Sequence, residues 1–310
     1  MSSRFLWIAR ASLTLLILAA GGLYFWSTID STELTAVILQ SDWVRVVVLA
    51  PFLIIAIWIL RAVRWGLCVS ASGGEIQPLK LYTFVGASLG LAAVTPAQIG
   101  EAAKIYWHRE HFDTMRAAGA FAAERLADLI VLSVLTAGAI FVLGWGERAY
   151  LIVVVVIAIA IAALLVIIAI QPWLARISWV DRAMDGVKMI VANRLRLTLF
   201  IVLTVLSWLL TGALWMVGFT AVGESPGMIT LFAVLGFATF TSIASMVPGS
   251  VGVSELSITA LLTLQGMVPE VALAAALMIR LIGLEILALG VIHYLAALVI
   301  QRNEHRLDSH

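Results

Sequence analysis

Long apolar runs dominate the hydrophobic pattern of the chain, and short polar segments separate them. A helix needs about 20 mostly apolar residues to cross the roughly 30 Å hydrocarbon core of a bilayer. Runs near or above this length predict six spanning helices, over residues 5–26, 43–60, 117–144, 149–170, 197–220 and 271–300. The fold class predicted from this pattern is an all-α polytopic membrane protein that forms a single transmembrane domain, 1–310.

Two further apolar stretches, 79–95 and 229–247, each end in a break that is rich in proline or glycine. Proline removes a backbone donor and disfavours helix in the residue before it, whereas glycine permits positive φ. The breaks read TPAQIGE and SMVPGSVGVSE, at 95–101 and 245–255. The helix-compatible pieces that follow them are 101–114 and 254–266. We predict two re-entrant hairpins whose tips face protein or a wet cavity, because unsatisfied backbone groups are not tolerated in lipid.

The distribution of basic residues supports this topology. With the N-terminus inside and both hairpins re-entrant, most of the 19 Lys and Arg residues fall on the cytoplasmic face. If 79–95 crossed the membrane instead, the basic residues of 171–196 would move outside, against the positive-inside rule. We therefore expect both termini to be cytoplasmic. The amphipathic 171–196 segment is interpreted as an interfacial helix, with a regulatory or partner-binding role as the alternative.

Composition agrees with a membrane protein and excludes several kinds of site. Hydrophobic residues make up 63% of the chain and charged residues only 12%, more apolar than any soluble core requires. The single cysteine, Cys68, excludes an internal disulfide and a cysteine-based metal site. His108 and His111 lie on one short segment without a partner cluster, so we expect no metal and no cofactor. We also expect no nucleic-acid partner.

The two breaks belong to an internal repeat with an offset of about 150 residues. Both match Pro-x-x-apolar-Gly and are followed by a carboxylate, and Trp58 and Trp65 share their spacing with Trp208 and Trp215. Three crossings separate the hairpins, so the second copy is inverted, an arrangement typical of transporters that bind near the membrane midplane. The expected parts are an extra N-terminal helix, a first repeat, a linking helix and a second repeat, at 1–26, 43–144, 149–170 and 197–300.

The breaks and their neighbours carry the candidate chemistry. A helix that begins near mid-membrane presents free N–H groups and favours anionic groups such as phosphate. Ser250 and Ser254 are expected to cap the second such helix, and Gln98 offers an amide at the first break. Arg61 and Arg64 end the second span, where they serve either as cytoplasmic anchors or as phosphate ligands.

Charged residues also lie inside predicted spans, where each costs about 2.5–3.5 kcal/mol and normally faces a polar interior. They are Glu124, Arg125, Asp128, Arg280 and Glu285. Arg125 and Asp128 are three residues apart and share a helix face. Two interpretations stay open: structural ion pairs, such as Arg125 with Asp128 or Arg280 with Glu255, and direct handling of a headgroup or proton.

RAVRW, TPAQIGEAAK, ERLADL, VPGSVGVSE and an arginine in the last helix follow one another in order. This combination resembles the flippase-like transmembrane family, which includes the membrane half of lysylphosphatidylglycerol synthases. Gln98 stands where the family usually has arginine, and Ser250 where it has glycine. The resemblance does not extend to the aminoacyl-transferase domain of those synthases, so it implies lipid translocation rather than aminoacylation. The positions that match are Glu101, Arg125, Asp128, Pro248, Gly249, Gly252, Glu255 and Arg280.

We therefore expect a lipid flippase or lipid transporter of a bacterial inner membrane, not an enzyme, that moves a polar, phosphate-containing headgroup. Without a nucleotide-binding motif, transport is downhill or gradient-driven, and the acidic residues leave proton coupling open. The alternatives are a small-solute secondary transporter and a membrane-embedded enzyme of lipid-phosphate metabolism. The candidate substrate-binding residues are Arg61, Arg64, Gln98, Gly100, Glu101, Glu124, Arg125, Asp128, Pro248, Gly249, Ser250, Gly252, Glu255 and Arg280.

Overall fold

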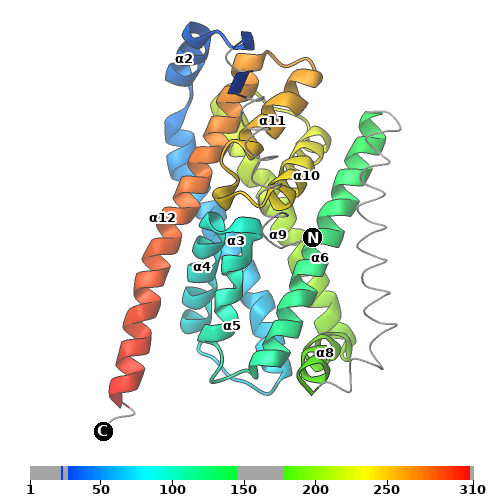
Figure 1. Cartoon of the computed structure of the whole chain (residues 1–310), viewed down its shortest axis with the longest axis vertical. Helices are drawn as coiled ribbons and strands as arrows, with labels where there is room; N and C mark the ends of the chain where they lie inside the picture. Colours follow the sequence, from blue (N-terminus) through cyan, green and yellow to red (C-terminus); the bar gives the residue numbers. More distant parts are fainter. Residues whose placement is uncertain (1–21, 24–26, 145–177, 308–310) are drawn as a thin grey trace, which may run out of the picture.

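The computed structural model describes residues 22–23, 27–144 and 178–307, and the secondary structure in these ranges is helical (Figure 1). The predicted crossing at 149–170 lies outside the described residues, as does nearly all of the one at 5–26. The first half contains α2 (Ser31–Gln40), α3 (Trp43–Ala71), α4 (Pro78–Val94), the 3₁₀ helix η1 (Pro96–Ala102) and α5 (Ala103–Trp107). The remaining elements are α6 (Thr114–Leu143), α8 (Ser178–Val191), α9 (Arg194–Ala221), α10 (Met228–Ser245), η2 (Pro248–Ser250), α11 (Val253–Leu264) and α12 (Pro269–Leu307).

Short polar side chains set where several helices begin. The carboxylate of Asp42 accepts a hydrogen bond from the backbone N–H of Arg45 and caps α3. Asp113 and Asn193 cap α6 and α9 in the same way, and Pro78 opens α4, where its missing N–H costs nothing. The helices thus begin at capping residues rather than at the edges of the apolar runs.

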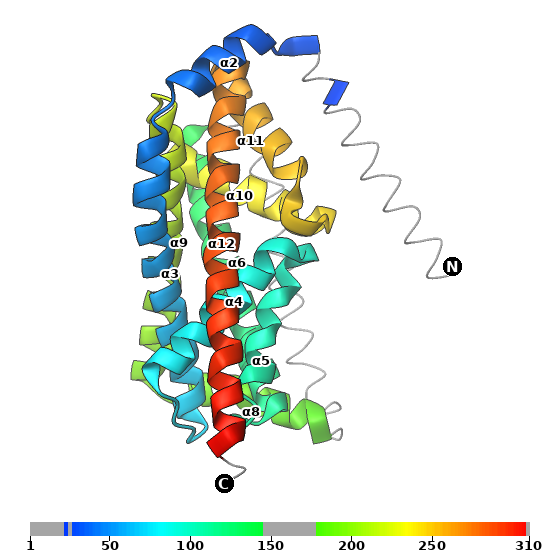
Figure 2. The same ribbon diagram turned by 90° about the vertical axis from the view of Figure 1, so that its left-hand side faces the viewer.

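Five described helices are long and apolar enough to cross a membrane: α3, α6, α9, α10 and α12. Four of them coincide with predicted crossings, so the prediction of a polytopic helical membrane protein is confirmed. The fifth, α10, covers the stretch predicted as the first arm of the second hairpin. Figures 1 and 2 show α10 and α11 together in the upper half of the molecule and α4 and α5 in the lower half.

The structure corrects two predicted boundaries. The helix expected at 101–114 is α-helical only over Ala103–Trp107, because Asp113 already caps α6 and the chain must turn before it. The span predicted to end at residue 60 continues to Ala71. Its last turns are retained because Trp65, Cys68 and Val69 are buried against neighbouring helices and need no lipid.

The long helix α12 crosses α4 at a pair of glycines. At 1.5 Å per residue its 39 residues extend about 58 Å, and Figure 2 shows the helix running from the upper end of the described bundle to the lower end. A Cβ atom on Gly90 would clash with the backbone of Gly290, and a Cβ atom on Gly290 would clash with the backbone of Gly90. Small residues let two membrane helices approach this closely, and backbone packing then holds them together.

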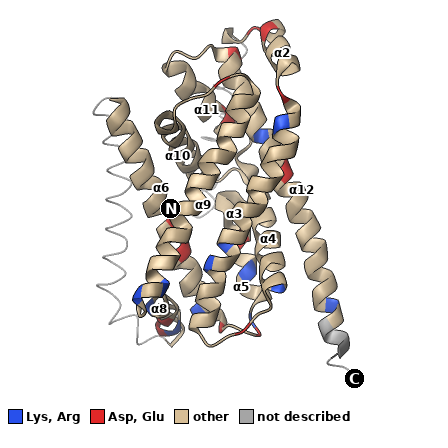
Figure 3. Ribbon diagram, turned by 180° about the vertical axis from the view of Figure 1, so that it is seen from behind, with Lys and Arg blue, Asp and Glu red and all other residues tan. Residues whose placement is uncertain are grey.

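The amphipathic helix α8 packs on the first turns of α6, and it confirms a helix within the 171–196 segment. Gly119 and Gly186 bring the two backbones together, since a Cβ on either would meet a carbonyl oxygen of the other helix. Figure 3 shows charged residues gathered on α8 at one end of the bundle. The helix therefore buries one face against protein and exposes a charged one.

We expect Gly90→Ala to destabilise the protein by about 1–3 kcal/mol, because the added methyl group overpacks the α4–α12 crossing. Gly138→Ala is the matched control: a Cβ there meets no atom within 4 Å. It should leave stability unchanged or raise it by up to about 1 kcal/mol. Thermal unfolding of the purified protein in detergent measures both, and equal midpoints for the two variants would contradict the tight crossing.

Candidate functional site

The first break is a strained turn closed by Thr95. Ala97 and Gln98 both adopt positive φ, at 48° and 60°. The Thr95 hydroxyl oxygen accepts a hydrogen bond of 2.8 Å from the N–H of Gly100. A Cβ on Gly100 would lie 2.5 Å from the carbonyl carbon of Leu91, so only glycine fits against the last turn of α4. Gly100 therefore serves the close approach of the backbone.

The second break is held by Glu255. Its carboxylate accepts hydrogen bonds from the backbone N–H of Gly252 (2.8 Å) and from the Ser254 hydroxyl (2.9 Å). Glu255 thus satisfies the start of α11, and the expectation that Ser250 or Ser254 caps this helix was wrong. Ser250 instead adopts a positive φ of 54°, a conformation that glycine adopts without strain.

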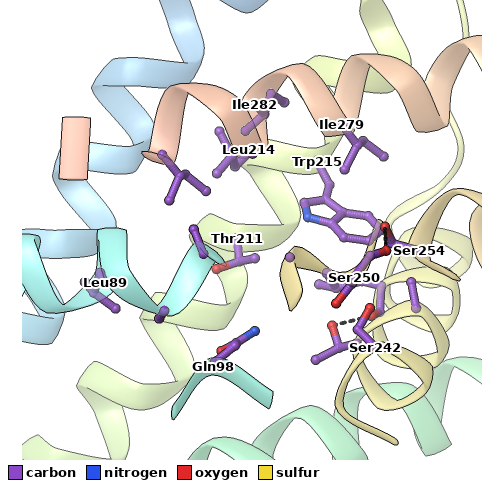
Figure 4. Close-up of a pocket in the computed structure, with 18 of the residues that line it drawn as sticks. Leu89, Gln98, Thr211, Leu214, Trp215, Ser242, Ser250, Ser254, Ile279 and Ile282 are labelled. Atoms are coloured by element: carbon purple, nitrogen blue, oxygen red, sulfur yellow. Dashed lines mark hydrogen bonds between the residues drawn. The ribbon is translucent and has the colours of Figure 1, made fainter. Parts of the chain in front are cut away.

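The two breaks contact each other midway along the molecule, and a cavity of about 310 Å³ lies beside them. A Cβ on Gly249 of the second break would lie 3.2 Å from the carbonyl oxygen of Ala93 at the end of α4. In Figure 4, Gln98 and Thr211 lie on one side of this cavity and Ser242, Ser250 and Ser254 on the other. Helices α3, α9 and α12 complete the wall, and two of them contribute arginines, Arg61 and Arg280.

Below the cavity lies a buried network of ion pairs, centred on Arg64. Its guanidinium is fully buried and binds both carboxylate oxygens of Asp128, at 2.7 and 3.1 Å. It also donates to Glu124 at 3.0 Å and to the Thr204 hydroxyl at 2.9 Å. Arg64 thereby ties α3 to α6 and α9 with a bidentate geometry that lysine does not offer.

The network continues through Glu101, whose side chain is fully buried and accepts from three cations. Lys104 binds it at 2.9 Å and Arg125 at 2.9 Å, whereas Arg61 reaches it only at 3.4 Å. Lys104 also pairs with Glu124, and its ammonium lies over the rings of Trp65 and Phe121.

The charges of this network do not cancel. Four cations share three carboxylates, which leaves one positive charge. Arg64 and Lys104 are buried and tightly paired, so the excess belongs to the more loosely held members. Of these, Arg61 lines the cavity, and its side chain remains 13% exposed. The unbalanced charge therefore lies at the cavity wall.

The second half of the chain repeats the central contact on a smaller scale. Arg280 pairs with Glu255, as Arg125 pairs with Glu101 in the first half. These pairs stand in matching positions of the two sequence repeats. Arg280 also donates to the carbonyl oxygen of Gly249 at 2.7 Å and so binds the turn itself. Both suggested ion pairs, Arg125 with Asp128 and Arg280 with Glu255, are present.

The model of the lysylphosphatidylglycerol synthase transmembrane region matches residues 11–290. The chain belongs to this family. The resemblance expected from the sequence is thereby confirmed, over most of the chain. No curated protein matches the chain.

The structure places the candidate residues in three groups. Those at the cavity wall are Arg61, Gln98, Gly249, Ser250 and Arg280. Those in the ionic network beside it are Arg64, Glu101, Glu124, Arg125 and Asp128. The turns themselves are formed by Gly100, Pro248, Gly252 and Glu255. Glu285 belongs to none of the three groups, and its Oε2 is a buried oxygen without a hydrogen-bond partner among the described residues.

Two side chains of this site, Lys104 and Trp208, were not predicted from the sequence. The sequence pattern does not single out Lys104, although its spacing of three from Glu101 is the signal of a shared helix face. Trp208 was noted only as part of the repeat. Its indole N–H is buried, has no partner among the described residues, and belongs to a residue of the cavity wall.

We expect Arg64→Ala to lower stability by about 3–5 kcal/mol, because it strands the buried carboxylates of Glu124 and Asp128. Arg64→Lys should recover only part of this loss. The control, Lys188→Ala, removes an exposed cation paired with Asp185 at 3.3 Å and should cost less than about 1 kcal/mol. Chemical unfolding in detergent compares the three, and an Arg64→Ala variant as stable as Lys188→Ala would refute the network.

Proposed function

We propose that this protein is a lipid flippase or lipid transporter rather than an enzyme. It moves a polar, phosphate-containing headgroup through the cavity between the two breaks while the acyl chains stay in the bilayer. One observation carries the proposal: the cavity wall holds Arg61 and Arg280, and no carboxylate of the described chain lines it. Membership of the synthase family supports a lipid-related role.

The state of the two arginines favours an anionic group. Arg61 Nε and Arg280 Nη2 are buried nitrogens with no acceptor among the residues described. The remainder of each side chain is partly exposed, 13% for Arg61 and 26% for Arg280. A guanidinium carries five N–H donors in a planar fork that matches phosphate oxygens. Both groups therefore retain capacity to bind a phosphate.

Apolar side chains beside the cavity favour a lipid over a small solute. Val94 and Ile99 at the first break are 43% and 61% exposed, and Met246 and Val251 at the second are 44% and 60% exposed. Large apolar groups exposed at the breaks, next to a cavity that carries two guanidinium groups, suit acyl chains that remain in the bilayer. A water-filled entrance for a soluble substrate would be better lined with polar groups.

The proposed topology has two hairpins that re-enter from opposite faces, with both termini in the cytoplasm of a bacterium. The placement of α4 and α5 in one half and α10 and α11 in the other supports it (Figures 1 and 2). The matching pairs Arg125–Glu101 and Arg280–Glu255 support an inverted repeat. In this proposal α10, although 18 residues long, ends inside the membrane at its break.

Transport in this proposal runs downhill or uses a gradient. For proton coupling, Glu285 is the best placed acid. Glu101, Glu124, Asp128 and Glu255 are held in ion pairs, whereas Glu285 has no cation within pairing distance among the residues described.

Single cysteines test the topology in a Cys68→Ala background. We expect cysteines at Glu75 and Asp113, which flank the α4–α5 hairpin, to react with membrane-impermeant reagents only from the cytoplasmic side. Cysteines at Glu224 and Gln265, which flank α10 and α11, should react only from outside. If the cysteines at positions 75 and 113 were labelled from opposite sides, the segment between them would have to cross the membrane.

A liposome scrambling assay tests the function. We expect the purified protein to move lipids with a fluorophore on one acyl chain between leaflets, and Arg61→Gln to slow this by tenfold or more, the effect expected when a charge-assisted contact is lost. Arg61→Gln should fold normally, because Lys104 and Arg125 still neutralise Glu101. Arg302→Gln, an exposed arginine near the end of α12, is the control. Absence of movement for every anionic, zwitterionic and isoprenoid lipid tried would rule out the flippase.

A further inference from the structure

The amphipathic helix α8 lies across the lower end of the bundle rather than along the spanning helices (Figure 2). It buries Val180, Gly186 and Ile190 against the protein. The side chains of Trp179 and Val191 are nevertheless each 55% exposed. A helix that lies across the ends of spanning helices and exposes apolar side chains beside charged ones is typical of a membrane interface. The charged residues of α8 are then at the level of the lipid headgroups.

This end of the molecule carries more basic than acidic side chains. Residues 113–116 and 178–196 together contain five cations and three carboxylates. The cations are Arg116, Arg182, Lys188, Arg194 and Arg196, and the acids are Asp113, Asp181 and Asp185. The carboxylate of Asp113 already accepts hydrogen bonds from two N–H groups at the start of α6. A basic excess at the headgroup level attracts anionic lipids.

A groove of about 310 Å³ lies between the first turn of α6 and the C-terminal half of α8. The residues that line it are Arg116, Asp185, Lys188, Met189 and Ala192. None of them lines the cavity beside the two breaks. The close backbone contact between α6 and α8, at Gly119 and Gly186, fixes the two sides of the groove relative to each other.

Arg116 is a cation of this groove without a partner. Its Nε is a buried nitrogen that has no acceptor, and its guanidinium takes part in no ion pair, among the described residues. It also lies in the first turn of α6, where the positive end of the helix dipole disfavours a cation. The planar fork of N–H donors on this side chain therefore retains its capacity to bind an anion from outside the protein.

Lys188 supplies a second cation that is loosely held. Its ammonium lies 3.3 Å from a carboxylate oxygen of Asp185 and 4.0 Å from one of Asp181, and its side chain is 53% exposed. Exposed pairs of this kind are weak, so another anion can compete for the ammonium. Asp185 is the carboxylate of the described groove wall. A bound anion would thus meet two attractive groups and one repulsive group.

We infer that this groove is a lipid site separate from the cavity, which binds the phosphate of an anionic phospholipid of the adjacent leaflet between Arg116 and Lys188. The phosphate replaces Asp185 as the partner of Lys188, and the exposed side chain of Val191, three residues further on, offers an apolar contact to the acyl chains. Because one cation belongs to α6 and the other to α8, the bound lipid bridges the two helices. This inference does not depend on transport through the cavity.

A thiol in the groove wall tests the inference locally. Ala192→Cys is made in a Cys68→Ala background, and its rate of reaction with a water-soluble maleimide is measured on the full-length protein in detergent. We expect dioctanoyl phosphatidic acid to slow the reaction severalfold and dioctanoyl phosphatidylcholine to have little effect. Ala36→Cys, at an exposed alanine of α2 at the opposite end of the bundle, is the control and should react at the same rate with either lipid.

Two substitutions should move the protection in opposite directions. Arg116→Gln should raise the phosphatidic acid concentration for half-maximal protection about tenfold, the effect of losing a charge-assisted contact. It should fold normally, because the Arg116 side chain has no partner among the described residues. Asp185→Asn removes the repulsive carboxylate and should lower that concentration severalfold. Arg302→Gln, an exposed arginine of α12, should leave it unchanged.

Three results would overturn the inference. Equal protection by phosphatidylcholine would show that the groove does not select anionic lipids. Equal protection by inorganic phosphate at the same concentration would make the groove a site for a soluble anion. Protection that neither Arg116→Gln nor Asp185→Asn alters would remove the groove charges from binding, and a gain in Asp185→Asn cannot arise from misfolding. Protection in a protein that moves no lipid in liposomes would support the inference and count against transport alone.

Discussion

The neutralisation of one fully buried guanidinium, that of Arg64, underlies the arrangement of the first half of this protein. A charge in the low-dielectric interior is tolerated only where its partners are fixed and its donors are used. Asp128 and Glu124 meet that demand from one helix, and Thr204 meets it from another. Three long helices, α3, α6 and α9, are therefore fixed relative to one another. Lys104 attaches the first break to them, because it pairs with both Glu101 and Glu124. The network reaches the cavity wall through Arg61.

The two halves hold their breaks by the same contact and support that contact by different means. At an offset of about 150 residues, Leu214 stands in place of Arg64, and Ile258 stands in place of Lys104. Both are almost fully buried, at 3% and 1% exposure, and pack in apolar clusters. Hydrophobic packing thus replaces the ionic network in the second half. Among the described residues one partly exposed ion pair, Arg280 with Glu255, remains there, so the second break has fewer ion pairs than the first.

Much of this could be predicted from sequence because it depends on spacing along the chain. Apolar run length marks crossings, and proline with glycine marks breaks, whatever the tertiary contacts are. The network could not be predicted in full, since Lys104 resembles a solvated basic residue until the fold brings Glu124 within reach. Nor could the backbone of Gln98 and Ser250 be foreseen: neither residue favours positive φ, and the surrounding contacts impose it. The predicted serine caps are also absent. Gly252 is the N-cap residue of α11, and its N–H donates to the carboxylate of Glu255.

Strained backbone conformations occur at the two breaks, beside the proposed binding residues. The non-glycine residues with positive φ in the described ranges all lie at the two breaks, and each costs on the order of 1–3 kcal/mol. At the second break the contacts that offset this cost are the Arg280 bond to the Gly249 carbonyl and the Glu255 bond to the Gly252 N–H. Arg280 is also a cationic group of the cavity wall. Under the proposed function, a phosphate that drew its guanidinium away would weaken the hold on a strained turn, so occupancy of the cavity and the conformation of the second break would be coupled.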